Sequence, residues 1–222
     1  MLERLLYWLG WPLIRLYAWV MLKIDVWEHA PMPDGPKIIA VNHPSCTDPF
    51  LTPLLSSHRV SILITEKAFQ VPIFGHYLKR SGHICVAPGK GETVLEKAEQ
   101  LLNQGRTVVI FPEGHISPKD GGFHPARTGV ARLALRTGAP VIPIGIHLPR
   151  ERLYSLTSNI EGENAFGDWY FHGPYHITVG KPMRFEGDIR DREHVVSVSR
   201  TIMQHIIGLA QQSAARMQAM LV

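Results

Sequence analysis

From residue 37 onward, short hydrophobic runs alternate with amphipathic segments. The pattern predicts strands at 37–41, 59–64, 83–86, 106–111, 141–146 and 176–179, and helices at 49–55, 92–103, 128–137 and 191–220. Strands that alternate with helices indicate an α/β fold with a mostly parallel central sheet flanked by helices. Residues 149–173 form the least regular segment, and we expect an insertion or a sheet edge there.

The first thirty residues form a strongly apolar segment that is rich in Trp and Tyr. Three basic residues interrupt the run, and Gly10-Trp11-Pro12 contains a helix breaker, whereas a spanning helix needs about twenty apolar residues. We therefore expect an interfacial two-helix segment at the membrane surface, with the alternative of a helix that packs on the protein's own core. This reading divides the chain into a membrane-interface segment, residues 1–30, and a domain over residues 31–222.

Composition narrows the classes of partner and of site. The 222 residues are 45% hydrophobic, which supports a substantial core, and carry a net charge of +4 without a run of five like charges. That balance suits an anionic membrane surface and argues against a nucleic-acid partner. The two cysteines, Cys46 and Cys85, form neither a disulfide framework nor a zinc motif. His172 and His176 are separated by Gly173-Pro174, which breaks the helix that would align them, so we expect no metal site.

Two polar motifs follow two of the predicted strands. Asn42-His43-Pro44-Ser45-Cys46-Thr47-Asp48 comes after strand 37–41, and Phe111-Pro112-Glu113-Gly114 closes strand 106–111. The carboxyl ends of parallel strands meet at one edge of a sheet, where ligands bind, so we expect the two loops to share one crevice. Asp48 precedes Pro49, which predicts a helix N-cap, and its carboxylate can also orient a histidine ring. The spacing therefore makes His43 a candidate general base with Asp48 as its partner.

At these residues the chain resembles the glycerolipid acyltransferases, the family that includes lysophosphatidic acid acyltransferase. The similarity runs over about residues 35 to 147 in the family order. The matching positions are Asn42, His43, Ser45 and Asp48; Lys67 with Val71 to Gly75; Gly82, Ile84 and Val86; Phe111 to Gly114 with Ser117; and Val141 to Ile144. Several motifs in the family order are a much stronger signal than any one of them.

The resemblance implies direct acyl transfer from acyl-CoA or acyl carrier protein (acyl-ACP), which are co-substrates, with no resident cofactor. His43 would take the proton of an acceptor hydroxyl and Asp48 would hold the imidazole. No serine or cysteine nucleophile is needed, and Cys46 has no family precedent as one. The implied substrate-binding residues are Ser45, Lys67, Phe111, Pro112, Glu113, Gly114, Ser117 and Arg127.

The chain departs from the family at two arginines that are associated with the acceptor's phosphate: Pro88 and Ile116 stand there. If each arginine supplied about 1.5–3 kcal/mol, losing both weakens phosphate binding by about a hundredfold to ten-thousandfold. Either a nearby cation substitutes, with Arg127 better placed than Arg80, Lys90 or Lys119, or the acceptor carries no phosphate. In the second case Glu113 could hold an acceptor hydroxyl.

The expected partners are a membrane surface, a lipid acceptor and the acyl donor. The expected location is the cytoplasmic face of a membrane, as a monotopic or peripheral protein. Lysophosphatidic acid is the default acceptor, and a glycolipid, an amino-acid-linked lysolipid or another phosphate-free alcohol is the rival. Two further readings stay open: a thioesterase that uses the same base on water, and a lipid-binding protein without turnover.

Overall fold

The computed structural model describes residues 2–160 and 163–220. The helices are α1 (Leu2–Met21), α2 (Asp48–Leu51), α3 (Glu66–Gln70), α4 (Phe74–Ser81), α5 (Gly91–Asn103), α6 (Gly129–Thr137) and α7 (Arg192–Ala219), with 3-10 turns η1 (Thr52–Leu55) and η2 (Arg150–Arg152). The strands are β1 (Leu22–Glu28), β2 (Lys37–Val41), β3 (Val60–Thr65), β4 (Ile84–Val86), β5 (Thr107–Ile110), β6 (Val141–His147), β7 (Tyr154–Ile160), β8 (Glu163–Trp169) and β9 (Gly173–Val179). The strands and helices predicted beyond residue 37 are confirmed, with ends that differ by a few residues.

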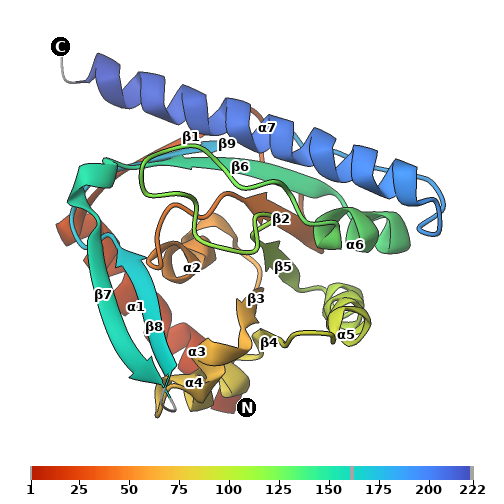
Figure 1. Cartoon of the computed structure of the whole chain (residues 1–222), viewed down its shortest axis with the longest axis horizontal. Helices are drawn as coiled ribbons and strands as arrows, with labels where there is room; N and C mark the ends of the chain where they lie inside the picture. The colour runs from red at the N-terminus through yellow and green to blue at the C-terminus, as the bar shows by residue number, and fades with distance from the viewer. Residues whose placement is uncertain (1, 161–162, 221–222) are drawn as a thin grey trace.

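Seven strands form one sheet in the order β1-β9-β6-β2-β5-β3-β4. The five strands from β6 to β4 are parallel, β9 is antiparallel to β6, and β1 is parallel to β9. On β2, Ile38 and Ala40 face the core under α5, α6 and α7, whereas Ile39 and Val41 face the core under α1 and α2. Figure 1 shows α7 across one face of the sheet and α1 and α2 on the other. The expected α/β fold with a mostly parallel, helix-flanked sheet is confirmed.

Helix α7 fixes the β1, β9 and β6 side of the sheet. A side chain at Gly145 on β6 would collide with the backbone nitrogen of Ala210, so glycine allows the close approach of α7. Ser213 donates to the Gly145 carbonyl at 3.0 Å. Arg216 donates through Nε to Asp25 on β1 at 2.9 Å and through Nη2 to the Ile177 carbonyl on β9 at 2.8 Å. These bonds join β1, β9 and α7 into one unit.

The N-terminal region contains one helix and one strand, so the expectation of two short helices is wrong. Helix α1 continues through Pro12, which removes one helix hydrogen bond but does not end the helix, because the following turns pack on the core through buried Ala18. Strand β1 pairs with β9, so residues 22–28 belong to the sheet although they lie inside the expected segment 1–30. Its alternation from Lys23 to Glu28 is a strand signal that the apolar composition masked.

Residues 149–173 contain η2 and an antiparallel hairpin, β7–β8, which is separate from the seven-stranded sheet. The expected insertion therefore has regular structure of its own. Across residues 2–160 and 163–220, no helix combines the length and the apolar character that crossing a bilayer requires.

Candidate active site

His43 and Asp48 meet at the carboxyl end of β2. The His43 Nδ1 atom lies 2.9 Å from Oδ2 of Asp48, which is fully buried, whereas 16% of the His43 side chain is exposed. The same Oδ2 accepts from the Ser45 backbone nitrogen at 2.8 Å, and Oδ1 accepts from the Tyr175 hydroxyl at 2.7 Å. Because the carboxylate accepts from its neighbours, His43 carries its hydrogen on Nδ1, and Nε2 keeps its lone pair.

Tyr175 is a member of this site that the sequence did not reveal. It lies on β9, more than a hundred residues from Asp48, and is fully buried. Burial and the Asp48 carboxylate raise the pKa of Tyr175 well above its usual value, so its hydroxyl stays a donor. A tyrosine within an apolar strand needs a partner for its hydroxyl, and this is the only hint that the sequence offers.

The N-cap role expected for Asp48 is wrong. Thr47 occupies the N-cap position of α2 and makes no side-chain cap bond, and Asp48 is the first helical residue. Its carboxylate turns back toward His43 and Ser45. The bonds to three donors hold the carboxylate in this orientation.

The turn between His43 and Asp48 is fastened to the end of β8. Ser45 Oγ accepts from the backbone nitrogens of Thr47 and Tyr170, both at 3.0 Å. The Cys46 nitrogen donates to the Asp168 carbonyl at 2.7 Å, and Thr47 Oγ1 donates to the Tyr170 carbonyl at 2.9 Å. Ser45 is fully buried and holds the turn, and its predicted role in substrate binding stays a prediction.

Neither Ser45 nor Cys46 is arranged as a nucleophile. Burial, with smaller contributions from Asp48 and Asp168, raises the pKa of the Cys46 thiol to about 12. A thiol attacks as the thiolate, which is scarce at such a pKa. The chemistry that this turn offers is therefore that of the imidazole.

Glu113 joins the loop after β5 to the turn after β2. Its Oε1 accepts from the His43 backbone nitrogen at 3.1 Å and from Ser117 Oγ at 2.7 Å, and its Oε2 accepts from the His124 nitrogen at 2.8 Å. The Ser117 nitrogen donates to the His43 carbonyl at 2.7 Å. The two motifs thus share one site, as expected. Glu113 and Ser117 are buried and bonded within the protein, and their predicted role in substrate binding stays a prediction.

The aromatic ring of Phe111 supports the imidazole. The two rings stack with centroids 4.2 Å apart and an interplanar angle of 29°. This contact fixes the plane of the His43 ring, which the Asp48 bond alone leaves free to tilt. Lys67 lies exposed on α3, after the carboxyl end of β3, and its predicted role in substrate binding stays a prediction.

Arg127 lies across the Phe111–Gly114 motif. Its nitrogen donates to the Pro112 carbonyl at 2.8 Å, and its Nη2 lies 2.6 Å from His115 Nε2. Gly114 has a φ of 68°, and a side chain there would reach within 2.7 Å of Arg127 Cδ. The glycine therefore allows the loop to turn and the exposed Arg127 side chain to lie on it.

Arg150 is a second cation that the sequence reading missed. It follows the end of β6 at the same sheet edge, and its guanidinium donates to the carbonyls of Pro118 and Gly122. Burial lowers its pKa, while Glu113 and Asp48 act in the opposite direction. Arg150 thus places a half-buried positive charge beside the two carboxylates of the site.

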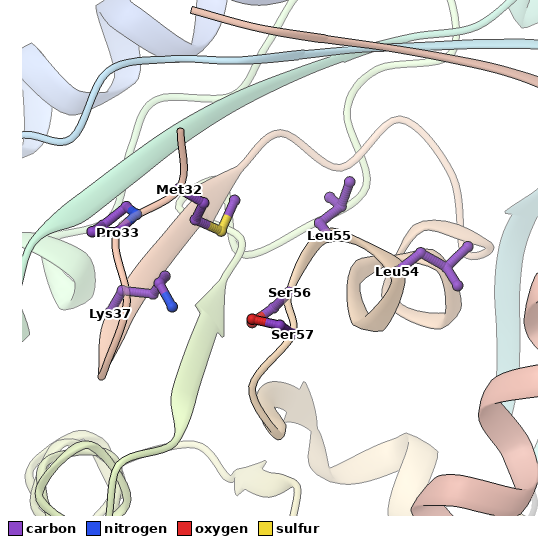
Figure 2. Close-up of a pocket in the computed structure, with 7 residues that line it drawn as sticks. All are labelled: Met32, Pro33, Lys37, Leu54, Leu55, Ser56 and Ser57. Atoms are coloured by element: carbon purple, nitrogen blue, oxygen red, sulfur yellow. The ribbon is translucent and has the colours of Figure 1, made fainter. Parts of the chain in front are cut away.

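A separate cavity of about 270 Å³ lies at the opposite edge of the sheet. Figure 2 shows its lining: Met32, Pro33, Lys37, Leu54, Leu55, Ser56 and Ser57. Lys37 is the first residue of β2, whereas His43 follows its last residue, so the cavity lies apart from the His43 site. No cluster of three or more His, Cys, Asp and Glu side chains that could bind a metal occurs within the described ranges.

Fold and site together define an α/β protein with an oriented histidine at the carboxyl edge of a mostly parallel sheet. The model of the Acyltransferase family matches residues 23–147, and the chain belongs to this family. The match spans the turn at His43, the Glu113 loop and the strands that carry them.

Individual relatives agree with this assignment. A chloroplastic 1-acyl-sn-glycerol-3-phosphate acyltransferase of Brassica napus is 29% identical over 60% of this chain and 39% of its own length. A lyso-ornithine lipid O-acyltransferase of Pseudomonas aeruginosa is 29% identical over 80% of this chain and 70% of its own length. The crystal structure of the 1-acyl-sn-glycerophosphate acyltransferase PlsC from Thermotoga maritima has the same fold, with a TM-score of 0.58 at 21% identity over 91% of this chain and 78% of that one. The chain thus spans about two fifths of the length of the plant relative.

Proposed function

We propose that the chain is a membrane-surface O-acyltransferase that moves a fatty acyl group from acyl-CoA or acyl-ACP to a hydroxyl of a lysolipid. The observation that carries the proposal is the bond between His43 Nδ1 and Asp48, which leaves Nε2 as the free proton acceptor of a partly exposed ring. Membership of the Acyltransferase family gives the class of reaction.

In this mechanism Nε2 of His43 takes the proton as the acceptor oxygen attacks the thioester carbonyl. The carbon–sulfur bond then breaks, and the thiolate leaves with the proton that His43 returns. Asp48 stabilises the imidazolium that forms between these steps, and Phe111 keeps the ring in plane. The acyl group passes directly to the acceptor, which agrees with the engaged Ser45 hydroxyl and the protonated Cys46 thiol.

The acceptor is proposed as a lysolipid, with two candidates for its polar group. Arg127 beside Gly114 is placed to meet a phosphate in lysophosphatidic acid. Pro88 and Ile116, where the family carries arginines, favour an acceptor that lacks a phosphate. The relative named lyso-ornithine lipid O-acyltransferase makes an amino-acid-linked lysolipid the first such acceptor to test.

A product assay tests the proposal. Purified protein in detergent receives acyl-CoA or acyl-ACP with lysophosphatidic acid, lyso-ornithine lipid or a lysoglycolipid, and mass spectrometry identifies the products. We expect thiol release that depends on an acceptor, and a loss of about 10²–10⁴ in rate for His43→Ala but not for the control His205→Ala on α7. Thiol release without acceptor would identify a thioesterase, and lysolipid binding without product would identify a binding protein.

Arg127→Ala separates the two acceptors. If Arg127 binds a phosphate, the variant should bind lysophosphatidic acid about tenfold to a hundredfold more weakly. Its affinity for a phosphate-free acceptor should stay unchanged. An equal effect on both acceptors would mean that Arg127 supports the loop only.

For location, we propose that α1 lies on the cytoplasmic face of a membrane. Its described part exposes Leu13, Leu16, Trp19 and Val20. The double variant Leu16→Ser/Trp19→Ser should bind vesicles more weakly, and unchanged binding would contradict this placement.

A further inference from the structure

The β7–β8 hairpin exposes large apolar side chains. Within the described residues its two strands pair with each other and not with the seven-stranded sheet. Phe166 is 77% exposed and Leu156 is 48% exposed. Leu156 pairs with Gly167, and Phe166 pairs with Thr157, so Leu156 and Phe166 project from opposite faces of the hairpin. Both faces therefore expose a large apolar side chain, which indicates that the hairpin makes a contact.

The hairpin is joined directly to α1. The Tyr17 hydroxyl on α1 donates to the carbonyl of Phe171, just beyond β8, at 2.8 Å, and lies 3.3 Å from that of Tyr170. Figure 1 shows β7, β8 and α1 on the side of the sheet opposite α7. On α1, Trp19 is 80% exposed. The hairpin and α1 thus present exposed apolar side chains from one connected unit.

The types of these exposed side chains indicate that the surface contacts a lipid bilayer. Trp19, Tyr154 and Phe171 are partly exposed aromatic residues of the kind that lie at headgroup level. Arg15 and Lys23 are exposed on α1 and at the start of β1, and they favour anionic lipid. Protein interfaces also favour aromatic residues and arginine, so the choice of a bilayer rests on the hydrogen bond that ties the end of the hairpin to the proposed membrane helix α1.

We propose that the β7–β8 hairpin is a second membrane contact, which together with α1 sets the height of the His43 turn above the bilayer. The inference rests on the proposed membrane-surface acyl transfer and deepens it. Hydrogen bonds link the hairpin to the site: the carbonyls of Asp168 in β8 and of Tyr170 just after it accept from Cys46 and Thr47. Lys119, from the loop after β5, also donates to Ser155 on β7 at 2.7 Å. These bonds tie the hairpin to the turn and to the loop after β5.

Vesicle binding tests the contact. The double variant Leu156→Ser/Phe166→Ser is compared with the full chain and with Val196→Ser/Met220→Ser, a control that removes two exposed apolar residues from α7 and its end. Flotation with vesicles of phosphatidylethanolamine and phosphatidylglycerol should show about tenfold weaker binding for the hairpin variant. The control variant should bind as the full chain does. Equal binding by the two variants would overturn the proposal, as would a dimer in sedimentation that the hairpin variant alone abolishes.

Activity gives an independent readout. The same acceptor is presented once in vesicles and once as a short-chain form dissolved as monomers. In the hairpin variant, the rate with the vesicle acceptor divided by the rate with the monomeric acceptor should fall about tenfold. Its circular dichroism spectrum and thermal midpoint should remain those of a folded protein. A ratio equal to that of the α7 control would refute the inference while transfer itself persists. No transfer to either acceptor by the unmodified chain would instead refute the proposed function.

Discussion

Replacing Asp48 by asparagine separates the charge of the carboxylate from its geometry. Oδ2 of Asp48 receives two donors, His43 Nδ1 and the Ser45 nitrogen, whereas Oδ1 receives the Tyr175 hydroxyl. An amide NH₂ group placed at Oδ2 would face both of those donors. The amide oxygen should therefore take that position, and its NH₂ group should donate to the Tyr175 oxygen. His43 then keeps its hydrogen on Nδ1, while the negative charge and the acceptor of the Tyr175 hydroxyl are lost.

The size of this loss can be bounded from the geometry. A charge-assisted hydrogen bond exceeds a neutral one by about 1 kcal/mol, which sets the lower limit. Two unit charges about 4 Å apart interact by about 4 kcal/mol at an effective dielectric constant of about 20, which sets the upper limit. At about 1.4 kcal/mol per factor of ten, Asp48→Asn should lower the rate by about fivefold to a thousandfold.

The assay is acceptor-dependent thiol release from acyl-CoA, measured for Asp48→Asn, Asp48→Ala and His43→Ala. Alanine removes the acceptor of all three donors and frees the tautomer, so Asp48→Ala should be slower than Asp48→Asn and should approach His43→Ala. Identical rates for the two Asp48 variants would refute the argument from the Ser45 nitrogen. An unchanged rate for Asp48→Asn would show that the carboxylate does not stabilise the imidazolium.

Three further changes have expected outcomes. Tyr175→Phe leaves one buried oxygen of Asp48 unpaired and should lower the free energy of unfolding by about 1.5–3 kcal/mol in urea titrations, with a lower rate of acyl transfer. Gly167→Ala places a methyl group 2.8 Å from Cys46 Sγ, so it should displace β8 from the turn and slow acyl transfer about tenfold. Adding Cys46→Ala should recover part of the rate, and no recovery would contradict this coupling. Burial lowers the pKa of His83 from 6.5 to about 4. As pH falls, His83 is therefore protonated in the unfolded chain before it is protonated in the folded protein. The stability of the folded protein that is present above pH 6.5 is lost toward pH 4. Unfolding at pH 5 should therefore require about 2 kcal/mol less than at pH 7, a difference that His83→Asn should remove.

The inner strands could be predicted because their residues are buried on both faces. In β2 and β5 every position is apolar except the first, which is Lys37 in β2 and Thr107 in β5. A continuous hydrophobic run therefore specifies each strand without reference to its neighbours. Strand β1 could not be recognised in the same way. In the sequence, β1 directly follows helix α1, which is rich in aromatic residues. The exposed Val26 and Trp27 extend this apolar composition, which obscured the alternation of polar and apolar residues in β1.

The candidate site was predictable only in part, for a physical reason. His43 and Asp48 are close in the chain, and their spacing shows the pair directly. The third partner of the carboxylate, Tyr175, reaches it only through the pairing of β9 with β6, which no local pattern reveals. Likewise, the bonds from β8 to the Cys46 turn depend on where an insertion folds back.

The family motifs divide by burial into two sets with different consequences. Ser45, Glu113 and Ser117 are buried and hold the turn and the loop, so matching them predicts the frame on which acyl transfer runs. The cations that we propose for the acceptor, Arg127 and Arg150, are exposed or half-buried. Sequence similarity at the buried positions therefore supports the class of reaction, whereas in our proposal the choice of acceptor depends on Pro88 and Ile116, where this chain differs from its family.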